Sequence, residues 1–150
     1  MKNNWLTLKS LFLCVSALSA SGLILSGCTE NANLNVGEWS LEYDAHANGI
    51  DISKGSKLYA AYKLADSVVS TRDYAKHHVS TKKINDHFGE GYHYEVTYTG
   101  NNLPVLVQSF YVYPTKDYVL TDFTLESTSE MASNYMAPVN VDRMPEVLNQ

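Results

Sequence analysis

Residues 92–126 read YHYEVTYTGNNLPVLVQSFYVYPTKDYVLTDFTLE, which is three strand-like runs separated by two short clusters of turn residues. In the first run, Tyr92–Thr99, aromatic and apolar side chains alternate with polar ones, a period of two that is typical of a half-buried strand. The clusters Gly100–Asn102 and Pro114–Asp117 contain Gly and Asn, which tolerate positive φ, and Pro, which removes a backbone donor. The stretch therefore predicts a three-stranded antiparallel meander.

The middle run, Val105–Tyr113, is apolar on both faces apart from Gln108 and Ser109, as a central strand would be. Such a strand needs cover on two sides, and the rest of the chain offers only weaker strand signals. We therefore expect a sandwich that is incomplete by itself. The residues expected to be strongly buried are Val96, Val107, Phe110, Phe123 and Leu125.

Shorter strand signals flank the meander. They lie at Glu38–Tyr43, Ile50–Ile52, Leu58–Leu64, Asp66–Thr71 and Ser133–Val141, the last interrupted by Pro138. Leu58–Leu64 also suits one or two helical turns, but its neighbours favour a strand. Residues 72–91 give the weakest signal: Val79, Thr81, Lys83 and Asn85 are compatible with an exposed strand, and Gly89–Gly91 is expected to form the turn into the meander. Many short strands with frequent turns predict an all-β fold, an antiparallel β-sandwich of supersandwich-like form.

The N-terminal segment has the organisation of a secretory signal. Lys2 and Lys9 precede the apolar run Leu11–Leu18, and small residues lead to Leu25–Cys28. This Leu-Ser-Gly-Cys sequence resembles the bacterial lipobox, which implies cleavage before Cys28 and attachment of lipid to it. The alternative is an ordinary signal peptide with a Cys near the cleavage site. Several acyl chains on one residue give stable anchoring to membrane lipid.

These signals divide the chain into four parts. We expect a lipoprotein signal peptide at residues 1–27, a polar tether at 28–37 and the β-sandwich at 38–141. Residues 142–150 are expected to be a tail or the start of a linker. The predicted location is the bacterial cell envelope, with the protein anchored by lipid in the outer membrane or at the cell surface.

Charge and cysteine content exclude several classes of function. Cys14 is removed with the predicted signal and Cys28 is consumed by the lipid, which leaves no thiol for a disulfide, a metal or a nucleophile. Removal of Lys2 and Lys9 lowers the formal charge from −5 to about −7. A negative surface repels phosphate backbones, so no nucleic-acid partner is expected.

No cluster of residues predicts a catalytic or metal site. His77 and His78 are adjacent, so in a strand they face opposite ways, and no zinc-binding spacing is present. We therefore interpret them, with His87 and His93, as solvated surface residues, and we expect no metal and no cofactor. The acidic residues are scattered, so no catalytic residue is assigned. The eleven tyrosines suit half-buried strands, and also sugar-binding surfaces; the scaffold role is favoured.

Five segments together resemble the N-terminal region of bacterial family 36-type α-galactosidases and their raffinose-synthase-like relatives. They are GEWSLEYD, LADSVVS, FGEGYHYEVTYTG, VQSFYVYPTKDYVLTDFTLES and SNYMAPVNV, spanning roughly Val36–Val141. In that family a β-supersandwich precedes a catalytic barrel that holds both catalytic aspartates. This chain ends before a barrel begins, so no position here inherits a catalytic role.

Two functions follow as hypotheses. The resemblance implies a lipid-anchored, non-catalytic sandwich of a glycoside hydrolase, acting in carbohydrate metabolism beside a missing catalytic barrel. The alternative is a self-standing surface lipoprotein that binds carbohydrate or a protein partner through exposed tyrosines. Whether the chain belongs to an enzyme is left open by the sequence.

Overall fold

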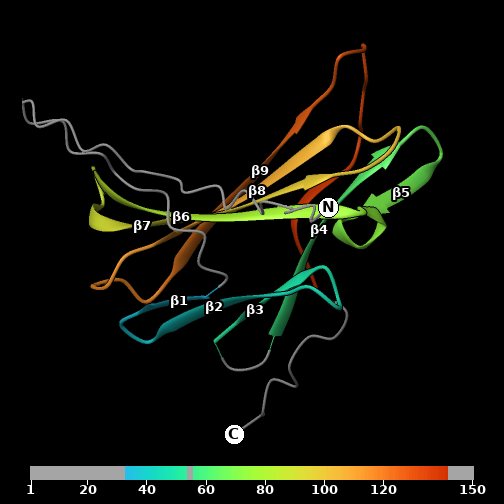
Figure 1. Cartoon of the computed structure of the whole chain (residues 1–150). Coiled ribbons are helices and arrows are strands. Elements are labelled where there is room, and N and C mark those ends of the chain that lie inside the picture. Colours follow the sequence, from blue (N-terminus) through green and yellow to red (C-terminus); the bar gives the residue numbers. More distant parts are fainter. Residues whose placement is uncertain (1–32, 54–55, 142–150) are drawn as a thin grey trace, which may run out of the picture.

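The computed structural model describes residues 33–53 and 56–141, and Figure 1 shows them as an arrangement of strands with almost no helix. The described residues form ten strands and one short 3-10 helix, η1 (Thr71–Asp73). The strands belong to two antiparallel sheets of four and six strands. The predicted all-β, sandwich-like fold is therefore confirmed.

The four-stranded sheet contains the predicted meander. Its strands are β6 (Lys76–Asp86), β7 (Gly89–Thr99), β8 (Val105–Val112) and β9 (Val119–Glu126), hydrogen-bonded in that order. The long β6–β7 hairpin crosses the middle of Figure 1. The meander is confirmed as β7–β8–β9, and β6 extends it at the β7 edge.

Gly89–Gly91 was expected to be a turn but lies in β7, and the hairpin turns at His87 and Phe88 instead. Gly91 is buried, and a Cβ atom added to it would lie 2.6 Å from Cδ1 of Tyr113. The glycine is therefore required by close packing against an aromatic ring, and not by a reversal of the chain.

The six-stranded sheet is built around β4 (Ser56–Leu64). Strands β3 and β5 pair with successive halves of one side of β4, and β10 pairs with its other side. Strands β2 and β1 continue the sheet beyond β3. The bounds of these strands are β1 (Asn33–Val36), β2 (Trp39–Asp44), β3 (Gly49–Ile52), β5 (Ser67–Ser70) and β10 (Met136–Val141).

Strand β1 differs from the expectation for this part of the chain, because Asn33–Val36 lie in the segment interpreted as a tether. Leu34 and Val36 point into the core, whereas the alternating residues Asn33 and Asn35 are exposed. Strand pairing with β2 thus compensates for the low β-propensity of Asn.

The core lies between the two sheets and corrects one part of the prediction. Val96, Phe110 and Phe123 are buried as expected, and Leu125 is half-buried against the core. Val107 is only half-buried. It alternates with Leu106 and Gln108, which are fully buried, so its side chain lies on the outer face of the sheet.

Most tyrosines are buried, and five of them belong to this core: Tyr43, Tyr62, Tyr74, Tyr94 and Tyr98. Seven of the eleven are buried: Tyr43, Tyr59, Tyr62, Tyr74, Tyr94, Tyr98 and Tyr113. The hydroxyls of Tyr62 and Tyr74 lie 3.0 Å apart, and Tyr74 donates to the carbonyl oxygen of Pro104 at 2.8 Å. Burial with a hydrogen-bonded hydroxyl is the scaffold role that the sequence favoured.

Gln108 connects the two sheets. Its Nε2 donates to the carbonyl oxygen of Pro138 in β10 at 2.9 Å, and its side chain is fully buried. Pro138 lies where the register of β10 against β4 shifts, between Ala137 and Asn140. Pro is tolerated at such irregular positions of an edge strand, which agrees with the predicted interruption of this strand.

Candidate functional site

Cys28, the predicted site of lipid attachment, lies outside the described residues, as does the signal segment at residues 1–27. Within the described part of the chain, no helix has the length and apolar character needed to cross a membrane. The lipid anchor therefore stays a prediction.

The histidines considered from the sequence do not converge. His77 and His78 face opposite sides of their sheet, and the ring of His77 packs on Tyr43 with centroids 4.2 Å apart. His87 is exposed in the β6–β7 turn. Among residues 33–53 and 56–141, no three His, Cys, Asp or Glu side chains are grouped as metal ligands.

His93 corrects the interpretation of these histidines as solvated. Its side chain is buried although it lies on the polar face of β7, because neighbouring side chains cover it. The ring stacks on Tyr111 at 4.6 Å between centroids with planes 8° apart. A residue on the polar face of a strand can therefore be buried when a large side chain of the neighbouring strand, here Tyr111, packs over it.

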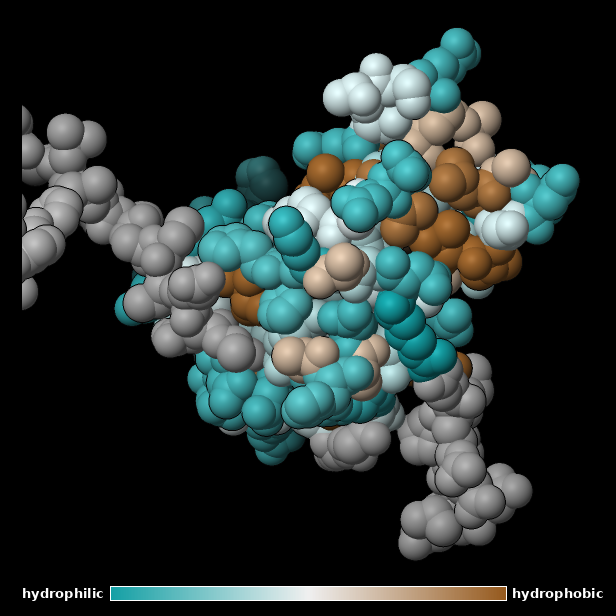
Figure 2. All heavy atoms as spheres, turned by 45° about the vertical axis from the view of Figure 1, so that its right-hand side comes forward, coloured by the Kyte–Doolittle hydropathy of each residue, from teal (hydrophilic) through white to brown (hydrophobic). Residues whose placement is uncertain are grey.

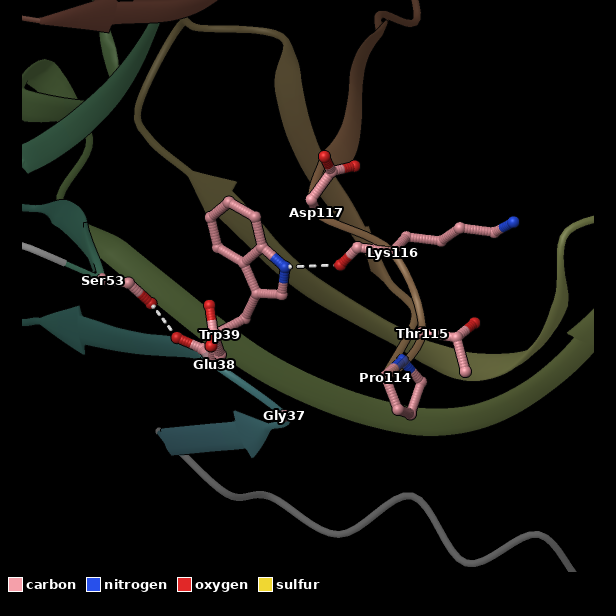
Figure 3. A pocket seen from close by; sticks show the side chains of 8 residues that line it. All are labelled: Gly37, Glu38, Trp39, Ser53, Pro114, Thr115, Lys116 and Asp117. Carbon is pink, nitrogen blue, oxygen red and sulfur yellow. Dashed lines mark hydrogen bonds between the residues drawn. The ribbon is translucent and has the colours of Figure 1, made fainter.

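A cleft of about 510 Å³ beside Trp39 is the most developed candidate site (Figure 3). Its walls come from the β1–β2 turn, the start of β2, the residue after β3 and the loop between β8 and β9. A volume of this size is within the range of small-molecule sites. The lining residues are Gly37, Glu38, Trp39, Ser53, Pro114, Thr115, Lys116 and Asp117.

The indole of Trp39 is held in one orientation. Its Nε1 donates a hydrogen bond of 3.1 Å to the carbonyl oxygen of Lys116, as Figure 3 shows. The loop that supplies this carbonyl is itself closed by a turn in which Lys116 N donates to Tyr113 O at 3.1 Å. The ring is half-buried against the core, so part of its surface remains available in the cleft.

The opposite wall is also fixed by hydrogen bonds. The Ser53 hydroxyl accepts from Ser40 N at 2.6 Å and donates to the carbonyl oxygen of Glu38 at 3.1 Å. Gly37, at φ +59°, turns the chain where a Cβ would lie only 3.2 Å from the carbonyl oxygen of Pro114. Glycine therefore allows the β1–β2 turn to approach the β8–β9 loop.

The cleft combines an aromatic surface with polar groups of both signs. Glu38 and Asp117 supply carboxylates and Lys116 supplies an ammonium group, although Figure 3 shows its side chain pointing away from the indole. A fixed aromatic ring with hydrogen-bonding groups at its edge can stack against the C–H face of a sugar and bind its hydroxyls. Nothing in this arrangement provides a nucleophile with an adjacent base.

In the sequence, Trp39 is only one residue of the short strand signal Glu38–Tyr43. Its hydrogen-bond partner is 77 positions away in the chain, so no local pattern could have revealed the cleft. Of the two turns that form its walls, only Pro114–Asp117 was predicted as a turn, whereas Gly37 was assigned to the tether and Glu38 to the first strand. Turns at one end of a sandwich are where binding residues gather.

A second depression, of about 470 Å³, lies at the end of the molecule formed by the β4–β5 turn, the loop before β8 and the segment after β9. Leu64, Leu103 and Met131 contribute to it. At the upper right of the view in Figure 2, apolar side chains gather on the surface, whereas most of the remaining surface in that view is hydrophilic. The polar lining of the depression comes mainly from residues 126–130, and no aromatic ring is among its lining residues.

Comparison of the chain with protein-family models, with characterised proteins and with solved structures finds no match. The class that can be assigned from the structure is therefore that of an all-β sandwich with a Trp-lined cleft at one end of its strands.

Proposed function

We propose that this protein is a non-catalytic, carbohydrate-binding β-sandwich that is anchored to the bacterial envelope by lipid on Cys28. The cleft beside Trp39 binds the sugar, with the indole as a stacking surface and the surrounding carboxylates, hydroxyls and backbone groups as hydrogen-bond partners. The single observation that carries this proposal is the fixed, half-buried indole of Trp39.

A fixed ring favours binding because its orientation entropy is lost when the protein folds and not when the ligand binds. The original expectation of exposed tyrosines gains less support, since most tyrosines are buried and only Tyr118 and Tyr135 are well exposed. Trp39 thus replaces the tyrosines as the proposed aromatic contact.

A second candidate function is the accessory sandwich of an α-galactosidase-like glycoside hydrolase. The observation that favours it is the outer face of β8, where the half-buried Val105 and Val107 have no second sheet packed over them among the described strands. A neighbouring catalytic barrel would cover such a face. Carbohydrate binding at Trp39 is compatible with this role, because accessory domains place substrate near a catalytic domain.

Fluorescence of Trp39 tests the proposal. The chain has two tryptophans, and Trp5 lies in the signal peptide predicted to be removed, so Trp39 is the only indole of the mature protein; a Trp5→Phe background keeps this so in unprocessed chain. A panel of oligosaccharides, including α-galactosides, is screened for binding to the immobilised protein, and ligands that bind are titrated by quenching or blue shift of the indole emission. A stacked sugar excludes water from the ring, so a saturable change is expected.

Two variants in the full chain give the matched comparison, with binding measured by calorimetry. Trp39→Ala should weaken binding roughly tenfold or more, the effect expected of an aromatic anchor. Tyr135→Ala removes an exposed aromatic residue that does not line the cleft and should leave the affinity unchanged. Equal affinities of the wild-type protein and a correctly folded Trp39→Ala variant would exclude the cleft as the sugar site.

A further inference from the structure

The outer face of the four-stranded sheet contains a shallow groove of about 560 Å³ that runs over β7, β8 and β9. Three carboxylates line it, and neither Lys nor Arg is among its lining residues. Its polar and apolar lining residues are His93, Glu95, Thr97, Val105, Val107, Ser109, Tyr111, Asp122, Thr124 and Glu126.

Strand register places the carboxylates in an ordered arrangement. Glu95 pairs with Ser109, and Ser109 pairs with Asp122. Two of the carboxylates therefore lie in one row across β7, β8 and β9, with Ser109 between them. Adjacent strands are roughly 4.8 Å apart, so Glu95 and Asp122 stand about 10 Å apart with a small side chain between them. A cationic group seated over Ser109 lies within reach of both carboxylates.

The next row contains an unsatisfied polar group. His93 is 6 % exposed, and its Nε2 has no hydrogen-bond partner among the described residues. The closest acidic atom is Oε2 of Glu95, at 3.8 Å, which is too far for a hydrogen bond. A buried nitrogen without a partner destabilises the protein unless some other group supplies the missing hydrogen bond.

Tyr111, on which His93 stacks, is hydrogen-bonded to one of the two carboxylates of the row that contains Ser109. The hydroxyl of Tyr111 donates to Oδ2 of Asp122 at 3.2 Å, which holds the ring against the imidazole. His93, Tyr111 and Asp122 therefore form a continuous wall along the groove.

We propose that this groove binds a primary ammonium group, seated over Ser109 between Glu95 and Asp122. When Glu95 rotates toward the ligand, it uncovers Nε2 of His93, which then accepts a hydrogen bond from a ligand donor. A free polyamine and the lysine side chain of a peptide both present this chemistry.

The charges around His93 agree with a cationic ligand. Burial lowers the pKa of His93 below its ordinary value, Lys82 on β6 adds to that effect, and the carboxylates of Glu95 and Asp122 oppose it. The imidazole is thus neutral at physiological pH and can accept a hydrogen bond. Metal ions are a poor fit, because no group of three ligating side chains is found in the described part of the chain.

Titration of the isotopically labelled full-length protein, followed by backbone amide NMR, tests the proposal with two ligands. Spermidine represents the free amine, and a blocked trilysine peptide represents the lysine side chain. Saturable shifts are expected in β7, β8 and β9, and they should weaken as salt is added because the attraction is between partly exposed charges. The ligand with the lower Kd identifies the source of the ammonium group.

The variants Glu95→Gln and Asp122→Asn should each weaken binding roughly tenfold, since each removes one charge-assisted contact. Glu130→Gln removes the same charge outside the groove and should have no effect. His93→Phe retains stacking on Tyr111 but lacks the nitrogen, and it should also weaken binding. Melting curves confirm that each variant is folded.

The peptide with acetylated lysines keeps its length and loses its charges, so it should not bind. The absence of saturable shifts with both amines up to about 10 mM would overturn the proposal. Shifts that are equal in the wild-type protein, Glu95→Gln and Asp122→Asn would also overturn it, because they would place the amine elsewhere. Neither result bears on the Trp39 cleft, which lies at a different place in the fold.

Discussion

Truncating Phe110 and Val107 separately would test which face of β8 forms the core. Phe110 is 1 % exposed and packs edge-on against Tyr94, with ring centroids 6.4 Å apart. Its ring buries roughly 150 Å² of apolar surface, which at about 25 cal/mol per Å² corresponds to about 4 kcal/mol. Phe110→Ala should therefore lower the free energy of unfolding by about 3–5 kcal/mol, a range that includes the cavity left behind.

Val107→Ala is the matched control on the same strand. Val107 faces outward and is half-buried, so its truncation should lower the free energy of unfolding by less than about 1 kcal/mol. Both values are obtained from urea unfolding followed by circular dichroism, with equal slopes in urea confirming that the same surface is exposed. A larger loss for Val107→Ala than for Phe110→Ala would refute the register of β8, because a shift of one residue exchanges the two faces.

Two further predictions concern the anchor and the buried tyrosines. Cys28→Ser should abolish incorporation of a labelled fatty acid in growing cells, and label retained on the Ser variant would contradict lipid attachment at Cys28. Burial raises the pKa of Tyr43 to about 12, with a smaller contribution from Asp44, and raises the pKa of Tyr74, Tyr94 and Tyr98 as well. Because these values exceed the pKa near 10 of an unfolded tyrosine, the stabilisation is complete below pH 10 and is lost as pH rises toward 12. Tyrosinate absorbance should then rise together with the loss of the β-sheet signal; complete titration near pH 10 with the fold intact would contradict the burial of these rings.

The parts of the fold that the sequence predicted are those in which one face of a strand is apolar. The alternation of Tyr92–Thr99 specified both the strand and its inner face, and the structure buries Tyr94, Val96 and Tyr98 accordingly. Strand β6 was harder to recognise because it lies at the sheet edge and of its residues only Val79 is buried. Its pairing with β7 along eleven residues supplies the order that its side-chain pattern does not indicate.

The candidate sites depend on contacts that the local sequence cannot show. Trp39 acquires its fixed orientation from a backbone carbonyl in a distant loop, and carbonyls carry no sequence signal. His93 was placed on the correct face of β7, but its burial depends on Tyr111 in the neighbouring strand. The sequence therefore predicted which side chains share one face of a strand. Their accessibility and hydrogen bonding could not be predicted, because both depend on the register between strands.

The same reasoning explains why β8 was expected to need cover on two sides. Val105–Val112 is apolar on both faces, yet only the inner face, with Leu106, Phe110 and Val112, packs against the second sheet. On the outer face, Val107 lies between Thr97 and Thr124, one row away from the pair of carboxylates. Another protein domain that covered this apolar strip would also desolvate the two carboxylates, so it would have to supply cationic groups that pair with them. The strip suits a ligand that presents a cation to Glu95 and Asp122 and methylene groups to Val107, as an alkyl ammonium does.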